Sequence, residues 1–237
     1  MMFSYAWLIP LMPLLAFVAI VFFANRYRDL SAKLAIGAMF ISFILAMGVL
    51  GTAIARYPGF AKEPFNHYIT WMPVGTTLFR LGFVLDPLAV AALAMVTTVC
   101  LMIFIYSQGY MHGDRLYSRF FAYVSLFATG MLGLVISNNL FELFVFWEIM
   151  GLCSYLLIGF WFERPSAYRA GIKAFLTTRI GDVILLLGIV YLYSRSGSLE
   201  FEHVFSTENL KALAEARVAL PLVGVGLFCR RVGGGTL

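Results

Sequence analysis

Residues 143–161 read LFVFWEIMGLCSYLLIGFW, and Glu148 is the single charged side chain in this run. A helix rises 1.5 Å per residue, so a run of this length extends about 28 Å, close to the roughly 30 Å thickness of a bilayer's hydrocarbon core. Its apolar residues do not alternate with polar ones. Because only helices and closed barrels satisfy their backbone hydrogen bonds in lipid, the run predicts a membrane-spanning helix that carries a carboxylate.

The composition of the whole chain also indicates a membrane environment. Of the 237 residues, 62% are hydrophobic and 12% are charged, and the mean hydropathy is +0.89. Soluble domains carry about 25% charged residues. The first apolar run lacks a basic n-region and contains Pro10 and Pro13, which predicts a retained span instead of a signal peptide. The net charge of +5 belongs to loops and indicates membrane topology, not a surface for nucleic acid.

The apolar runs predict an all-α fold, a polytopic transmembrane helix bundle with six complete spans and the beginning of a seventh. Each complete run has the 17 to 25 residues, approximately, that a helix needs to cross a bilayer. No stretch has the composition of a linker between domains. The predicted spans are 7–24, 34–55, 83–106, 119–137, 140–161 and 172–193, and the seventh begins near residue 216.

Two longer stretches lie between the predicted spans. Residues 56–82 contain Pro58, Pro64 and Pro73 with aromatic residues between them, a pattern compatible with a short β-hairpin. In residues 194–215, Ser206 or Thr207 is a suitable N-cap for a short amphipathic helix over 208–217.

The distribution of basic residues predicts an orientation. Short loops rich in Lys and Arg stay on the cytoplasmic side of a membrane. The loops 25–33, 107–118 and 162–171 are short and dense in basic residues, so we predict that they lie inside and that the N-terminus lies on the outer side. The basic residues in and next to these loops are Arg26, Arg28, Lys33, Arg115, Arg119, Arg164, Arg169 and Lys173.

Glu148 is the candidate functional residue with the highest physical cost. It lies about 12 Å along its helix, where an ionised side chain costs at least a few kcal/mol unless a partner or water compensates it. Such residues usually face the interior of the bundle and carry function. A carboxylate whose proton affinity depends on a movable partner suits a proton relay. The alternative is a carboxylate permanently paired with a neighbouring helix.

Other charged residues fall in or near the spans. Arg179 and Asp182 lie three residues apart on one helical face, which suits either an internal ion pair or coupling to a neighbouring helix. Asp86 and Glu142 stand near helix starts, where acids favour a capping or interfacial role. Lys173 lies at the end of a span, from which its side chain can reach the interface.

No motif for a redox group or metal stands out. The three histidines have no metal-ligand spacing, and the three cysteines are scattered, which predicts neither a disulfide framework nor a metal site. The chain has no dinucleotide fingerprint and no phosphate loop. Redox chemistry within this chain is therefore not expected.

Several motifs together carry a resemblance to a known family. Residues 1–228 resemble the N-terminal part of the largest antiporter-like membrane subunit, the chain L or subunit 5 type, of the proton-pumping NADH:quinone oxidoreductase, respiratory complex I. The large subunits of multisubunit sodium/proton antiporters share much of this pattern. The motifs are FVLDPLA at 83–89, YSQGYMHGD at 106–114, RFFAYVSLF at 119–127, ISNNLFELFVFWEIMGLCSYLLIGFW at 136–161 and KAFLTTRIGDV at 173–183.

The resemblance implies roles for the buried charges. Glu148 matches the family's helix-5 glutamate, which pairs with a lysine on helix 7 and takes part in proton translocation. Arg179 and Asp182 match a helix-6 charge pair that helps to transmit charge changes along the membrane arm. The resemblance also implies that partner subunits hold the flavin, the iron–sulfur clusters and the quinone, and that this chain holds none. Its partners would be other antiporter-like subunits in a bacterial plasma membrane or an equivalent energy-coupling membrane.

The last residues depart from the family's pattern. Where the family has the helix-7 lysine in a G-K-S-A-Q segment, residues 229–237 read CRRVGGGTL. Two adjacent arginines are costly inside a bilayer, and three glycines are poor helix formers. We expect 1–228 to be the N-terminal part of an antiporter-like domain and 229–237 an aberrant tail from a frameshift or truncation. The alternative is a genuine C-terminus with its arginines at the interface. On the first reading, Glu148 lacks its cation.

The sequence leaves three functions open. The first is part of a proton-translocating subunit of NADH:quinone oxidoreductase, and the second is part of a sodium/proton antiporter subunit without a redox partner. The third is a membrane scaffold that transports nothing. The state of Glu148 distinguishes the first two from the third, because a scaffold does not need an exchangeable proton inside the membrane.

Overall fold

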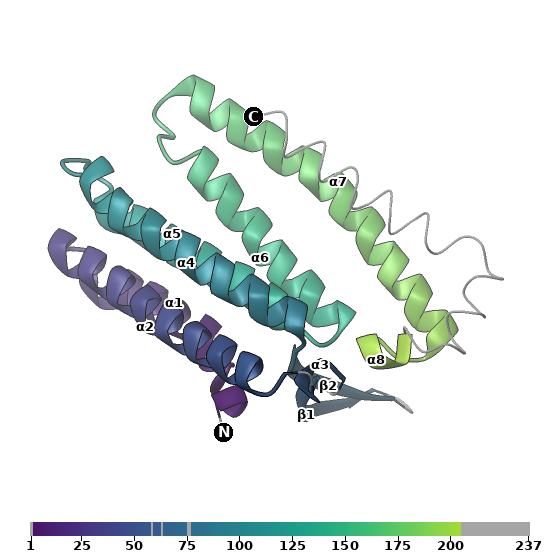
Figure 1. Cartoon of the computed structure of the whole chain (residues 1–237). Helices are drawn as coiled ribbons and strands as arrows, with labels where there is room; N and C mark the ends of the chain where they lie inside the picture. Colours follow the sequence, from purple (N-terminus) through teal and green to yellow (C-terminus); the bar gives the residue numbers. More distant parts are fainter. Residues whose placement is uncertain (1, 58, 63, 75–76, 205–237) are drawn as a thin grey trace. The chain divides into compact units, whose positions relative to one another are not determined.

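A computed structural model describes residues 2–57, 59–62, 64–74 and 77–204 (Figure 1). The predicted seventh span from residue 216, the predicted helix over 208–217 with its cap at Ser206 or Thr207, and the tail 229–237 lie outside the described residues. The chain forms two compact units. The first comprises Met1–His67 and Phe83–Ser137, and the second comprises Tyr68–Gly82 and Asn138–Leu237.

The first unit contains four of the long apolar helical segments. Small residues occupy many of their buried positions, among them Ala32, Ala35 and Ala46, and this allows the backbones of neighbouring helices to approach closely. Its elements are the 3-10 helix η1 (Met2–Tyr5), α1 (Leu8–Ala19), the π-helix η2 (Ile20–Ala24), α2 (Arg28–Ala55), the short α3 (Gly59–Lys62), α4 (Pro87–Tyr110) and α5 (Tyr117–Ile136).

Buried hydroxyl groups join these helices. Ser31 on α2 donates to the Ser118 hydroxyl on α5 at 2.8 Å, and Ser42 on α2 donates to the Ile9 carbonyl on α1 at 2.8 Å. The second bond has a specific cause. Pro13 has no N–H, so it cannot donate to the carbonyl four residues earlier, which is that of Ile9. In lipid no water replaces the missing donor, and the neighbouring helix supplies it.

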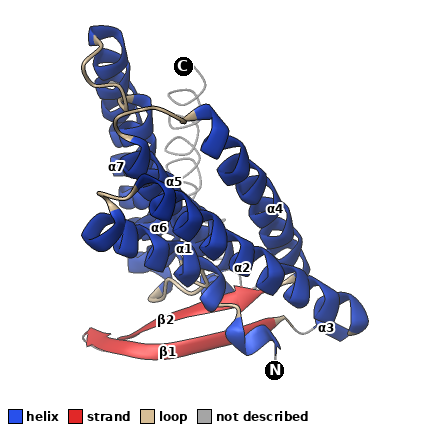
Figure 2. Cartoon of the chain, turned by 90° about the vertical axis from the view of Figure 1, so that its left-hand side faces the viewer, coloured by secondary structure: helices blue, strands red, loops and turns tan. Residues whose placement is uncertain are grey.

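The β-hairpin predicted within residues 56–82 is present, but it is longer than expected. Strands β1 (Phe65–Val74) and β2 (Thr77–Leu85) pair in a two-stranded sheet, drawn in red in Figure 2. Because β2 runs to Leu85, the third span begins at Pro87 and not at residue 83 as predicted. Asp86 caps this helix by accepting the Ala89 N–H at 2.6 Å.

The second unit contains two long helices that pack against each other. They are α6 (Leu140–Ile158) and α7 (Pro165–Ser196), followed by the short α8 (Phe201–Val204). Gly171 allows the two to meet closely, because a Cβ there would lie 3.4 Å from the Gly159 Cα. Pro165 occupies the first turn of α7, and Gly197 ends it in the left-handed conformation with φ of 69°.

Two helices begin earlier than the sequence predicts. α2 starts at Arg28 instead of residue 34, and α7 starts at Pro165 instead of 172, so the predicted loops 25–33 and 162–171 are largely helical. The predicted loop 107–118 shortens to the residues between Tyr110 and Tyr117. Hydropathy marks where lipid ends, whereas Arg, Lys and Ala continue a helix into water at little cost.

The predicted class of fold is confirmed. Six helical segments of the described residues are long and apolar enough to cross a membrane: Met2–Ala24, Arg28–Ala55, Pro87–Tyr110, Tyr117–Ile136, Leu140–Ile158 and Pro165–Ser196. Within the described residues, the sheet consists of the two strands of the hairpin and does not close into a barrel. The chain is a helical membrane bundle with one hairpin among its described elements.

The bond from Ser42 to Ile9 generates a first prediction. Ser42→Ala leaves the buried Ile9 carbonyl without a donor and should lower the free energy of unfolding by about 1–2 kcal/mol. Pro13→Ala restores the backbone N–H, so P13A/S42A should recover most of this loss. Unfolding by titration with sodium dodecyl sulfate, followed by circular dichroism, measures both variants. The control is Thr52→Val, because the Thr52 hydroxyl donates to the Val49 carbonyl of its own helix and not to a neighbouring helix. An S42A loss that P13A does not reduce would contradict this account.

Candidate functional site

An ion pair joins the two long helices of the second unit. The Glu148 carboxylate on α6 contacts the Arg179 guanidinium on α7. The side chains are 23% and 30% exposed, respectively, although both lie well inside apolar helices. An isolated charge at this depth is costly, and each group offsets part of the cost of the other.

Asp182 extends this pair into a network. Arg179 Nη1 lies 3.9 Å from an Asp182 carboxylate oxygen, one turn further along α7. The Trp147 indole on α6 donates to the other Asp182 oxygen at 3.1 Å. Asp182 is only 3% exposed. The guanidinium therefore interacts with one carboxylate from each helix, and adjacent residues of α6 contact both charged partners on α7.

Aromatic rings support the guanidinium. Its Cζ atom lies 4.5 Å from the centre of the Phe175 ring, within the range of a cation–π interaction. The Phe175 ring in turn lies 5.1 Å from that of Tyr155 on α6. Phe175 stands four residues before Arg179, so both side chains lie on the same face of α7. The ring restricts the guanidinium on one side, and the Nη1 group is the one that lies near both carboxylates.

The expectation that Glu148 lacks a cation is wrong for this structure. The family resemblance placed its partner, a lysine, on a later helix that lies outside the described residues, whereas the structure shows Arg179 of α7 in contact with Glu148. The two interpretations of Arg179 and Asp182 also occur together, since Arg179 is near Asp182 on its own helix and contacts Glu148 on the neighbouring one. The spacing of residues along α7 indicates the contact between Arg179 and Asp182. The contact between Arg179 and Glu148 joins two helices, and the pattern of one helix does not indicate it.

Glu142 has a different environment from Glu148. Its carboxylate accepts the Gly82 N–H of β2 at 2.8 Å and the Asn138 N–H at 3.3 Å. Asn139 caps α6 by accepting the Glu142 N–H at 2.8 Å. Glu142 thus fastens the second strand of the hairpin to the beginning of α6.

Further contacts in the same region were not predicted from the sequence. The Asn139 amide donates to the Arg80 carbonyl at 3.0 Å, and the Arg80 side chain lies 3.6 Å from Glu200. The Leu140 N–H donates to the Leu199 carbonyl at 3.0 Å. The Asn138–Asn139 pair before an apolar run is a helix-start signal that identifies Asn139 as a cap. The partners of that cap come from distant segments and leave no local signal.

The remaining predicted residues lie outside the ion-pair network. Asp86 belongs to the first unit as the cap of α4. Lys173 is exposed on α7, two turns before Arg179. Within the described residues, no group of three or more His, Cys, Asp or Glu side chains has the arrangement of a metal site.

These features define a class: a polytopic membrane protein with a charged network inside two adjacent spans. Two family models match the chain. The one described as "NADH:quinone oxidoreductase/Mrp antiporter, TM" matches residues 137–230, and the one described as "NADH-Ubiquinone oxidoreductase (complex I), chain 5 N-terminus" matches residues 71–121. The chain belongs to this family of antiporter-like membrane subunits and corresponds to the N-terminal part of the subunit 5 type. It is an integral membrane protein.

Individual relatives agree with this assignment. The chain is 46% identical over 205 residues to the chloroplastic NAD(P)H-quinone oxidoreductase subunit 5 of Nephroselmis olivacea, covering 84% of this chain and 31% of that one. It is 41% identical over 208 residues to NAD(P)H-quinone oxidoreductase chain 5 of Picosynechococcus sp., covering 85% and 31%. The chain thus spans about a third of the length of these relatives.

A solved structure shares the fold. A chain of the Mrp complex from Dietzia sp. superposes with a TM-score of 0.72 at 23% identity, covering 93% of this chain and 23% of that one. At this level of identity the likeness concerns the arrangement of helices.

The shared guanidinium generates a second prediction. Arg179→Gln leaves Glu148 without its cation and should lower the free energy of unfolding by about 2 kcal/mol, less than for a fully buried pair because both groups are partly exposed. The double variant E148Q/R179Q removes both charges and should be more stable than R179Q alone. Titration with sodium dodecyl sulfate measures the difference. Arg169→Gln, an exposed arginine of the same helix, is the control. Additive losses would refute the coupling.

Glu142 generates a third prediction, which concerns how firmly strand β2 of the hairpin is held. Glu142→Ala removes the acceptor for the Gly82 N–H, so the Gly82 amide should exchange with solvent deuterium about tenfold faster. Glu142→Gln keeps an acceptor but loses the charge and should give an intermediate rate. Hydrogen exchange with mass spectrometry of β2 measures both, with Glu202→Ala on α8 as the control. Unchanged exchange in E142A would show that other contacts hold the strand.

Proposed function

We propose that this chain is part of a proton-translocating membrane subunit of an NADH:quinone oxidoreductase, in which Glu148 gains and loses a proton. The observation that carries the proposal is the ion pair between Glu148 of α6 and Arg179 of α7, inside two apolar helices. Membership of the antiporter-like family supports the same function. The chain spans about a third of its relatives, so the activity would belong to a larger assembly.

The geometry suggests how the charges interact. Arg179 contacts Glu148 and lies 3.9 Å from Asp182. A proton that arrives at Glu148 neutralises one of the two carboxylates near Arg179. The guanidinium then interacts mainly with Asp182. Loss of that proton restores the first contact. The protonation state of Glu148 on α6 is thereby linked to the position of the Arg179 guanidinium on α7, because the two side chains are already in contact.

Electron transfer would take place in other subunits. We propose that partner subunits hold the flavin, the iron–sulfur clusters and the quinone, and that this chain adjoins other antiporter-like subunits. The relatives are named as subunits of NAD(P)H-quinone oxidoreductases, which supports a multisubunit assembly. We further propose a bacterial plasma membrane or an equivalent energy-coupling membrane as its location, with the N-terminus on the outer side. The basic residues Arg26, Arg28 and Arg164 would then face the inside.

The decisive experiment separates proton transport from electron transfer. Glu148→Gln, introduced into the native membrane assembly, should reduce NADH-driven proton uptake into inverted vesicles by at least about tenfold, because glutamine cannot exchange a proton. Quenching of an acridine dye measures uptake, and NADH oxidation in the same vesicles measures electron transfer. Glu202→Gln, an exposed carboxylate on α8, is the matched control and should keep the parental ratio of protons to electrons.

Each other outcome points to a different function. E148Q vesicles that pump at the parental ratio would overturn the role of Glu148 and favour a scaffold. Transport that depends on sodium and continues without NADH would identify an antiporter.

A further inference from the structure

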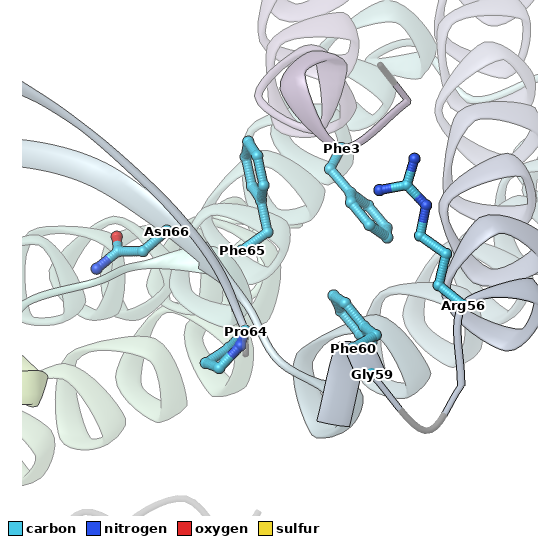
Figure 3. A pocket seen from close by; sticks show the side chains of 7 residues that line it. All are labelled: Phe3, Arg56, Gly59, Phe60, Pro64, Phe65 and Asn66. Atoms are coloured by element: carbon cyan, nitrogen blue, oxygen red, sulfur yellow. The ribbon is translucent and has the colours of Figure 1, made fainter. Parts of the chain in front are cut away.

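A pocket of about 650 Å³ lies in the first unit, whereas the charged network belongs to the second. Its walls come from η1, the residue that ends α2, the short α3 and the beginning of β1. Figure 3 shows the rings of Phe3, Phe60 and Phe65 converging, with the Arg56 guanidinium beside them. Nothing in the proton-translocating function uses these residues, so the pocket requires an explanation of its own.

The pocket combines a rigid apolar wall with an accessible positive charge. The Phe3 and Phe60 rings stack at 4.9 Å and are 5% and 7% exposed, and Phe65 lies 5.8 Å from Phe3. The Arg56 Cζ atom lies 5.5 Å from the Phe3 ring centre, and its side chain is exposed. No carboxylate of the described residues forms an ion pair with Arg56. As far as the described residues go, the guanidinium therefore keeps N–H groups that a ligand can reach.

Chain order places this pocket at a membrane boundary. Phe3 lies at the beginning of the first span and Arg56 directly follows the second, and two consecutive antiparallel spans begin and end on the same side. Phospholipid phosphates occupy this level of a bilayer. A guanidinium binds phosphate through two parallel hydrogen bonds, and the rings offer contact to glycerol and the first carbons of an acyl chain. The volume falls within the range of small-molecule sites.

We propose that this pocket is a binding site for one anionic phospholipid, with the headgroup phosphate on Arg56 and the glycerol region against Phe3, Phe60 and Phe65. A free phosphate ion would use the guanidinium alone, and the aromatic wall would contribute nothing to its binding. The combination of both features selects a lipid. The site would fix the end of α2 and the N-terminal segment to the membrane surface on the side of the hairpin.

The test uses a photoactivatable phosphatidylglycerol, with its reactive group near the glycerol, in nanodiscs that contain the full chain. Mass spectrometry of peptides locates the label, which we expect in the segments that contain Phe3 and Phe60. Arg56→Gln should weaken labelling there about tenfold. The matched control is Arg195→Gln, an exposed arginine in the last turn of α7, which should leave labelling unchanged. An excess of inorganic phosphate should not compete.

Several results would overturn the proposal. Labelling equal to that with a photoactivatable phosphatidylcholine of zero net charge would show no preference for an anionic lipid. Unchanged labelling in R56Q would exclude the guanidinium, and displacement by inorganic phosphate would assign the site to a free anion. Should R56Q fail to insert, Arg56→Lys keeps the charge without the planar fork and should reduce labelling by a smaller factor. Parental labelling in R56K that does not fall with added salt would also refute the assignment.

Discussion

The inability of hydrocarbon to form hydrogen bonds governs the described structure. Each backbone N–H and C=O in a span needs a partner within the protein, and this requirement produces the long helices. Side chains obey the same rule. Thr97 donates to the Leu93 carbonyl at 2.8 Å and Thr129 to the Ser125 carbonyl at 3.0 Å, within their own helices. Where Pro13 removes a donor from α1, Ser42 of α2 replaces it.

The same constraint explains why the buried charges occur together. Glu148, Arg179 and Asp182 would each be costly alone, and in the structure one guanidinium interacts with both carboxylates. The Trp147 indole and the Phe175 ring complete the surroundings of this network. Because two carboxylates share one guanidinium, a change in the charge of one group alters the interactions of the others. Stability and the proposed proton transfer thus draw on the same contacts.

The sequence predicted the elements better than their ends and their contacts. Apolar runs identify spans because burial in lipid requires them, and Glu148 and Arg179 were conspicuous because charges there are rare. The starts of α2 and α7 were predicted too late, because helices continue beyond the hydrocarbon that hydropathy detects. The contact between Glu148 and Arg179 joins two helices, and the periodicity of one helix carries no information about its neighbour. The hydrogen bond from the Gly82 N–H to Glu142 could not be predicted either, because it joins a strand to a helix far away in the sequence.

The length of α7 has a mechanical consequence. Its 32 residues extend about 48 Å, well beyond the hydrocarbon core. Just past its C-terminal end, the Leu199 carbonyl accepts the Leu140 N–H and Glu200 pairs with Arg80, so that end is anchored. A rigid rotation about this end would displace each residue in proportion to its distance from the anchor. A displacement of about 1 Å at Arg179, some 27 Å from the anchor, becomes about 1.8 Å at Pro165. The length of the helix thus sets how far a movement at the charged residue would be carried toward its N-terminal end.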